Sequence, residues 1–133
     1  MPFHTTPDSY TKLLMHADED NGSIAFTDSS DSPHTITRDA SVDHDTGNKV
    51  FGSSRIYIPK ANRLQIADST DWQFGTGDFT IDLWAKYWST TDTAGLFTYF
   101  LNASNRYHLT NYSNLEFYCN RAGSSQNLSF TNT

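Results

Sequence analysis

The expected fold is decided by one stretch, Asp68-Ser-Thr-Asp-Trp-Gln-Phe-Gly-Thr-Gly-Asp-Phe-Thr-Ile-Asp-Leu-Trp84, an acidic turn with two glycines that leads into an alternating segment. Phe79, Ile81 and Leu83 occupy every second position, which places them on one face of a β-strand. The glycines supply the backbone freedom that a tight corner needs. The stretch therefore predicts a turn followed by a strand over 79–87.

The rest of the chain repeats this pattern of short apolar segments between turns. The 133 residues are enough for one domain, and an aromatic content of 14% favours strands. Turn signals recur at short intervals without sustained helical periodicity, which is typical of an antiparallel sandwich or barrel. The remaining predicted strands lie at 12–15, 24–26, 35–38, 55–59, 63–66, 96–101, 107–109, 115–118 and 128–130.

Charge and cysteine content narrow the function classes. The net charge is −6 and no basic stripe occurs, which argues against binding to a nucleic-acid backbone. No apolar run is long enough for a membrane span. Cys119 is the only cysteine, so it has no intrachain disulfide partner, and we expect it to be a small core residue.

Four blocks of the sequence carry a family resemblance. They lie in the order Thr11–His16, Phe26–Thr37, Lys49–Ser54 and Asp71–Trp84. Together they resemble the laminin-G-like, or concanavalin A-like lectin and glucanase, domains of the kind found in phage tail and virion proteins. The resemblance implies an all-β, antiparallel jelly-roll sandwich of two packed sheets over residues 11–133, preceded by an N-terminal arm at 1–10.

Two positions depart from the family pattern. The turn at 59–63 is basic, whereas relatives have a turn that resembles Gly-Asp-Tyr. The sequence also stops at Thr133, before the closing strands that the resemblance implies. A sandwich without them would leave an open edge, so we expect an incomplete domain or strands supplied by a neighbouring chain.

Glycoside hydrolysis needs two carboxyl groups on either side of the scissile bond. The only glutamates, Glu19 and Glu116, are far apart in the sequence. Asp78 and Asp82 would lie about 13 Å apart along a strand, beyond the roughly 5–9.5 Å that this chemistry uses. We therefore predict a non-catalytic protein, although a fragment of a glycosidase with its acid pair elsewhere is a third alternative.

Calcium is the one cofactor that the sequence indicates. Asp43 and Asp45 lie in one predicted turn, and Asp68 and Asp71 lie in another. Carboxylate oxygens at turns are the ligands that Ca²⁺ prefers. Aspartate is also common in turns because its side chain hydrogen-bonds the local backbone, and this alternative stays open.

Carbohydrate binding is the other candidate chemistry, since aromatic rings stack on sugars and amides bind their hydroxyl groups. Trp88 and Tyr112 lie in turn-like contexts, and Asn111 precedes Tyr112. We predict these three as carbohydrate-binding residues. The alternative is that the aromatic side chains pack in the core.

The resemblance implies a non-catalytic structural protein of a bacteriophage virion, in capsid decoration or in a tail or fibre, with a lectin-like domain. Its expected partners are other virion proteins, further copies of itself and a host or surface glycan. The alternative is a calcium-dependent carbohydrate-binding or adhesion module of a bacterial surface protein, located outside the cell. A fold of this kind serves many functions, so these remain expectations.

Overall fold

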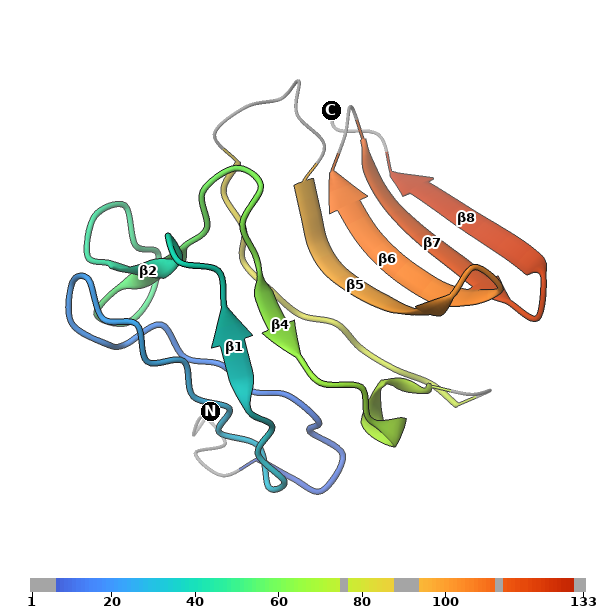
Figure 1. The fold of residues 1–133 in the computed structure, drawn as a ribbon, viewed down its shortest axis with the longest axis horizontal. Helices are drawn as coiled ribbons and strands as arrows, with labels where there is room; N and C mark the ends of the chain where they lie inside the picture. Colours follow the sequence, from blue (N-terminus) through green and yellow to red (C-terminus); the bar gives the residue numbers. More distant parts are fainter. Residues whose placement is uncertain (1–6, 75–76, 88–93, 112–113, 131–133) are drawn as a thin grey trace. The chain divides into compact units, whose positions relative to one another are not determined.

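The computed structural model describes residues 7–74, 77–87, 94–111 and 114–130. The chain divides into two compact units, Met1–Asp71 and Trp72–Thr133. All described strands pair antiparallel (Figure 1). The only helix in the described residues is one short 3₁₀ helix, η1 (Thr70–Trp72). The predicted all-β, antiparallel class is thus confirmed, whereas a jelly-roll sandwich over 11–133 stays a prediction.

The first unit contains two small sheets. In one, β1 (Ile36–Arg38) pairs with β4 (Leu64–Ile66); in the other, β2 (Asp43–Asp45) pairs with β3 (Arg55–Tyr57). Each strand has three residues, and an isolated bridge joins Met15 to Asp28. Most of the backbone in this unit therefore depends on other hydrogen-bond partners.

Asp28 provides several of these partners. Its Oδ1 accepts the backbone N–H groups of Leu14 and Ser30, both at 3.0 Å, and its Oδ2 accepts that of His34 at 2.8 Å. The residue is only 4% exposed. A buried carboxylate with three N–H donors is well satisfied, so Asp28 fixes three loop positions at once.

The centre of the first unit is a small and partly polar core around His44. The His44 ring is buried and stacks on Phe26 with 4.9 Å between ring centroids. Its Nδ1 lies 3.0 Å from Ser54 Oγ, and its Nε2 lies 2.9 Å from the Ala25 carbonyl oxygen. Val42 of the same unit is also fully buried, and both imidazole nitrogens of His44 have partners.

The second unit contains one larger sheet. Its strands are β5 (Ala94–Asn102), β6 (Asn105–Asn111), β7 (Leu115–Arg121) and β8 (Ser124–Phe130), adjacent in chain order (Figure 1). Ala122 and Gly123, between β7 and β8, both have positive φ values, 50° and 83°. Two such residues form the type of turn whose twist suits a tight hairpin.

One face of this sheet is aromatic, and Tyr107 lies at its centre. Directly paired residues share a face, so Tyr99, Tyr107 and Cys119 lie on the same side. The Tyr107 ring stacks on Phe74 at 4.8 Å and on Tyr99 at 5.1 Å. Its hydroxyl donates to the Trp72 carbonyl oxygen at 2.9 Å, and burial raises the pKa of this phenol.

Four predicted local structures are wrong. The predicted strand at 79–87 is not formed; Phe79 instead packs against Phe117 of β7. The predicted strands at 12–15 and 24–26 are likewise not formed, apart from the Met15 bridge. Residues 43–45 were predicted as part of a turn but form β2. In each case the choice depends on a pairing partner distant in the chain, which local alternation does not specify.

Candidate functional site

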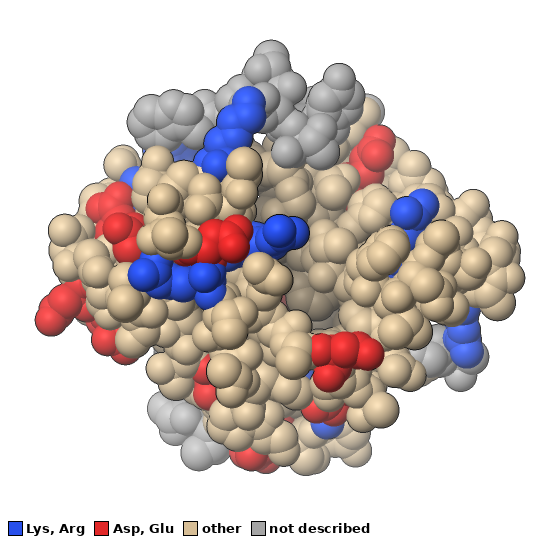
Figure 2. All heavy atoms as spheres, viewed as in Figure 1, with Lys and Arg blue, Asp and Glu red and all other residues tan. Residues whose placement is uncertain are grey.

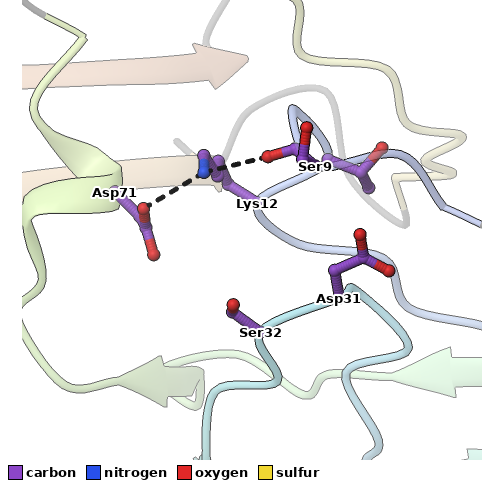
Figure 3. Close-up of a pocket in the computed structure, with 6 residues that line it drawn as sticks. Ser9, Lys12, Asp31, Ser32 and Asp71 are labelled. Atoms are coloured by element: carbon purple, nitrogen blue, oxygen red, sulfur yellow. Dashed lines mark hydrogen bonds and ion pairs between the residues drawn. The ribbon is translucent and has the colours of Figure 1, made fainter.

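A polar pocket of about 220 Å³ lies in the first unit (Figure 3). We call it the Asp71 pocket. It is lined by Ser9, Thr11, Lys12, Asp31, Ser32 and Asp71. Its volume is below the roughly 300–1,000 Å³ of ordinary small-molecule sites, so it has room for a small polar molecule rather than a large ligand.

Asp71 is held by two nitrogen groups from distant parts of the chain. Its Oδ1 lies 3.5 Å from Lys12 Nζ, and its Oδ2 lies 3.1 Å from His34 Nε2. Lys12 Nζ also donates to the Ser9 carbonyl oxygen at 3.1 Å (Figure 3). With both oxygens engaged, the Asp71 carboxylate has a fixed orientation at the pocket wall.

Local hydrogen bonds position the segments that carry these side chains. Asp8 Oδ1 accepts the N–H groups of Tyr10 and Thr11, at 3.1 and 2.9 Å, which forms the turn before Lys12. The backbone of His34 is tied to Asp28. The pocket is thus assembled from turns whose backbone is fixed by buried or local carboxylates.

The opposite part of the lining comes from Asp31 and Ser32, which lie on a separate loop (Figure 3). Asp31 is exposed, and its carboxylate is available to accept hydrogen bonds from a ligand. Together with Lys12 and the hydroxyl groups, the lining offers both donors and acceptors. This combination suits a hydroxylated ligand, whose groups donate and accept at once.

The four aspartates predicted as calcium ligands do not form one site. Asp71 lies in the pocket, and Asp68 is exposed three residues earlier. Asp43 and Asp45 belong to β2, where Asp45 Oδ2 accepts the Arg55 Nε–H at 3.0 Å. Within the described ranges there is no group of three or more His, Cys, Asp or Glu side chains that could hold a metal ion.

Arg55 also alters the charge behaviour of Asp45. The hydrogen bond from the guanidinium, helped by the Gly47 backbone N–H, holds the pKa of the Asp45 carboxyl below its usual range. Asp45 is therefore an ionised partner of an arginine across β2 and β3. Neither Asp45 nor Asp71 has a carboxylate free of cationic neighbours, and calcium binding at these positions stays a prediction.

The predicted carbohydrate-binding residues are only partly described. Trp88 and Tyr112 lie outside the described residues. Asn111 ends β6 and lines a second hollow, of about 400 Å³, in the second unit. The lining is otherwise mainly apolar, with Leu109 and Leu115 on the sheet and Ile81 and Leu83 on the preceding segment.

The cluster of polar side chains on the second face of the four-stranded sheet was not predicted from the sequence. There the Arg106 guanidinium lies over the Tyr118 ring, 5.3 Å from its centroid, and the His108 ring stacks on it at 4.8 Å. Asn120 Nδ2 donates to the Tyr118 hydroxyl at 3.3 Å. Hydrogen bonds from Arg106 and Asn120 lower the Tyr118 pKa. The signal available was the alternation of Arg106 with His108 and of Tyr118 with Asn120, which begins or ends outside the strands predicted at 107–109 and 115–118.

The wider surface has mixed charge. On the face shown in Figure 2, Lys and Arg side chains lie among Asp and Glu rather than in one basic patch. Among the described residues, no helix has the length and apolar character needed to cross a membrane.

Comparison with known proteins gives no relative. No protein-family model, no curated protein and no solved structure matches the chain. The resemblance to laminin-G-like domains therefore stays an expectation from the four sequence blocks alone.

Proposed function

We propose that the chain is a non-catalytic structural protein of a bacteriophage virion, part of a capsid decoration or of a tail or fibre, whose lectin-like domain binds a surface glycan. The four ordered sequence blocks support the lectin-like domain, and the all-β, antiparallel structure is consistent with it. The virion assignment follows from the same blocks, since the resemblance is to domains of phage particles.

The Asp71 pocket is the observation that supports the proposal of glycan binding. Sugar hydroxyl groups donate to carboxylates and accept from ammonium groups, and Asp31, Asp71 and Lys12 offer both. The contacts of Asp71 with His34 and Lys12 fix its orientation before a ligand arrives, which lowers the ordering cost of binding. The volume fits a single sugar unit at the end of a chain better than an extended oligosaccharide.

A glycan array tests the binding proposal with the purified chain. We expect a small set of glycans to bind, and we expect Asp31→Ala to weaken that binding about tenfold, the effect of losing one hydrogen bond to a charged group. Asp31 is exposed, so the variant should fold normally. Asp20→Ala removes the same charge at another exposed position of the first unit and should bind as the unaltered chain does.

Four results would exclude the proposal or change it. A blank array, or equal binding by the Asp31→Ala and Asp20→Ala proteins, would exclude glycan binding at the Asp71 pocket. Sugar release from an array glycan would exclude a non-catalytic role. Binding that a chelator abolishes would favour the calcium-dependent adhesion module instead.

The virion assignment has its own test. Mass spectrometry of phage particles purified from the source of the chain should detect its peptides at a fixed ratio to the other structural proteins. Immunogold labelling of the same particles should place the chain on the capsid or on the tail. Absence from the particles would exclude the structural role, whatever the glycan array shows.

A further inference from the structure

β8 is an edge of the four-stranded sheet whose outer side has no strand partner among the described residues. All seven of its residues, Ser124–Phe130, are exposed, and each pairs with β7 in a continuous register. An edge strand presents a row of backbone N–H and C=O groups that another strand can pair with.

This edge lacks the features that ordinarily prevent such pairing. Ser124–Phe130 contains no charged residue and no proline, and its pairing with β7 shows no bulge. The opposite edge differs, because β5 has register shifts between Gly95 and Phe97 and between Phe100 and Asn102. Bulges bend and twist a strand, so the β5 edge is a poor template for a further strand, whereas the β8 edge is a regular one.

Apolar side chains at the β8 edge add a reason for it to be covered. Leu128 and Phe130 are 59% and 55% exposed. They pair with Phe117 and Leu115 of β7, so they lie on the aromatic face of the sheet. The apolar face thus continues to the open edge, where it meets water.

We propose that a second copy of this chain covers the edge, with the two β8 strands paired antiparallel about Asn127. The two four-stranded sheets would then form one continuous sheet across the dimer. In this register Asn127 faces Asn127 of the partner copy, Leu128 faces the partner's Gln126, and Phe130 faces the partner's Ser124. Each apolar side chain meets a smaller or polar one, so the strand is complementary to itself.

Charge does not oppose a second copy at this edge. Two chains of net charge −6 repel each other over most of their surface. The β8 strand carries no charge, so symmetric pairing there brings no like charges into contact. A two-fold arrangement also closes after two copies, whereas pairing of β8 with the bulged β5 edge would generate an open chain of copies.

Analytical ultracentrifugation over a concentration series tests the dimer. We expect a monomer–dimer equilibrium for the unaltered chain. Asn127→Lys places two lysines opposite each other at the two-fold axis and should raise the dimer dissociation constant about fivefold or more. Thr98→Lys is the matched control, since Thr98 is exposed on the same polar face at the other edge, on β5, and this variant should dimerise normally.

A mixture of oppositely charged variants distinguishes charge repulsion at the interface from misfolding of a variant. Asn127→Glu alone should weaken the dimer to a similar degree, and an equal mixture of the Asn127→Lys and Asn127→Glu chains should recover the dissociation constant of the unaltered chain. A chain that stays monomeric over the whole series would overturn the proposal. So would dimerisation of Asn127→Lys equal to that of the unaltered chain, or equal weakening by Thr98→Lys.

Discussion

The two units are held together differently. In the second, C-terminal unit (72–133), aromatic side chains stack on one face of a sheet whose strands have seven to nine residues. In the first, N-terminal unit (1–71), the strands have three residues, and carboxylates accept hydrogen bonds from the backbone between them. Tyr107 illustrates the first arrangement, with its ring between neighbouring aromatic rings. Asp28 illustrates the second, with three backbone N–H groups bound to one side chain.

The difference shows two ways in which backbone N–H and C=O groups find hydrogen-bond partners. A long strand gives its N–H groups to a neighbouring strand and leaves its side chains free to pack. A loop-rich unit has fewer ladder bonds, so buried polar side chains must accept its N–H groups. The two units should therefore respond to different substitutions, the C-terminal unit to loss of ring packing and the N-terminal unit to loss of single carboxylates.

The largest effect is expected for Tyr107→Ala in the C-terminal unit. Removal of a buried aromatic side chain should lower the free energy of unfolding by about 3–5 kcal/mol. Trp72, Trp84 and Trp88 are the only tryptophans and all belong to this unit, so urea unfolding followed by tryptophan fluorescence reports on it. Tyr107→Phe keeps the ring and loses only the bond to the Trp72 carbonyl, so it should cost about 1 kcal/mol. Equal losses for the two variants would show that ring packing is not the main contribution.

A smaller effect, about 3 kcal/mol, is expected for Asp28→Ala in the N-terminal unit, because three backbone N–H groups lose their acceptor. Hydrogen exchange of the Leu14, Ser30 and His34 amides measures it directly. Asp28→Asn is the control: it keeps one carbonyl oxygen, so exchange should be intermediate. Unchanged exchange in Asp28→Ala would contradict the assigned role of this carboxylate.

Asp28 also predicts a pH dependence. Burial raises the pKa of this carboxyl, but the N–H groups of His34, Leu14 and Ser30 outweigh it and hold the pKa below the ordinary value of 3.8. A lowered folded-state pKa means that the stabilisation is complete above 3.8 and is lost as the pH falls through the lower folded value. Exchange of the same three amides should therefore show a loss of protection below pH 3.8 that is absent in Asp28→Ala.

Alternation in the sequence predicted three strands of the C-terminal sheet, since the segments 96–101, 107–109 and 115–118 all lie within β5, β6 and β7. It found only the end of β8, because Ser124–Asn127 is polar and hairpin pairing rather than apolar pattern makes it a strand. The alternation at 79–87 is as regular, yet that segment covers the aromatic face with Phe79 and is not itself a strand.

The candidate site was less predictable than the sheet. Asp71 was identified from its turn, but its partner His34 lies 37 positions earlier in the chain, and Lys12 lies earlier still. No local pattern indicates that three such residues meet. The polar side chains of Arg106 and Tyr118 were available as alternating residues, but which face of the sheet they share depends on the β6–β7 register.

The smallest effect is expected for Arg55→Lys, which tests whether charge pairs matter to the N-terminal unit as its backbone-binding carboxylates do. Asp45 and Arg55 face each other across β2 and β3, and their side chains are 31% and 25% exposed. A pair this accessible to water should contribute little to stability, so the free energy of unfolding should scarcely change.

The sensitive measurement is the Asp45 pKa by NMR. A lysine lacks the planar guanidinium, so this pKa should rise toward its ordinary value of 3.8. Arg63→Lys changes another arginine, 3.7 Å from Asp39, and should leave Asp45 unaffected. An Asp45 pKa that is the same in Arg55→Lys would assign the shift to the Gly47 backbone N–H, and Asp45 would then act on the backbone as Asp28 does.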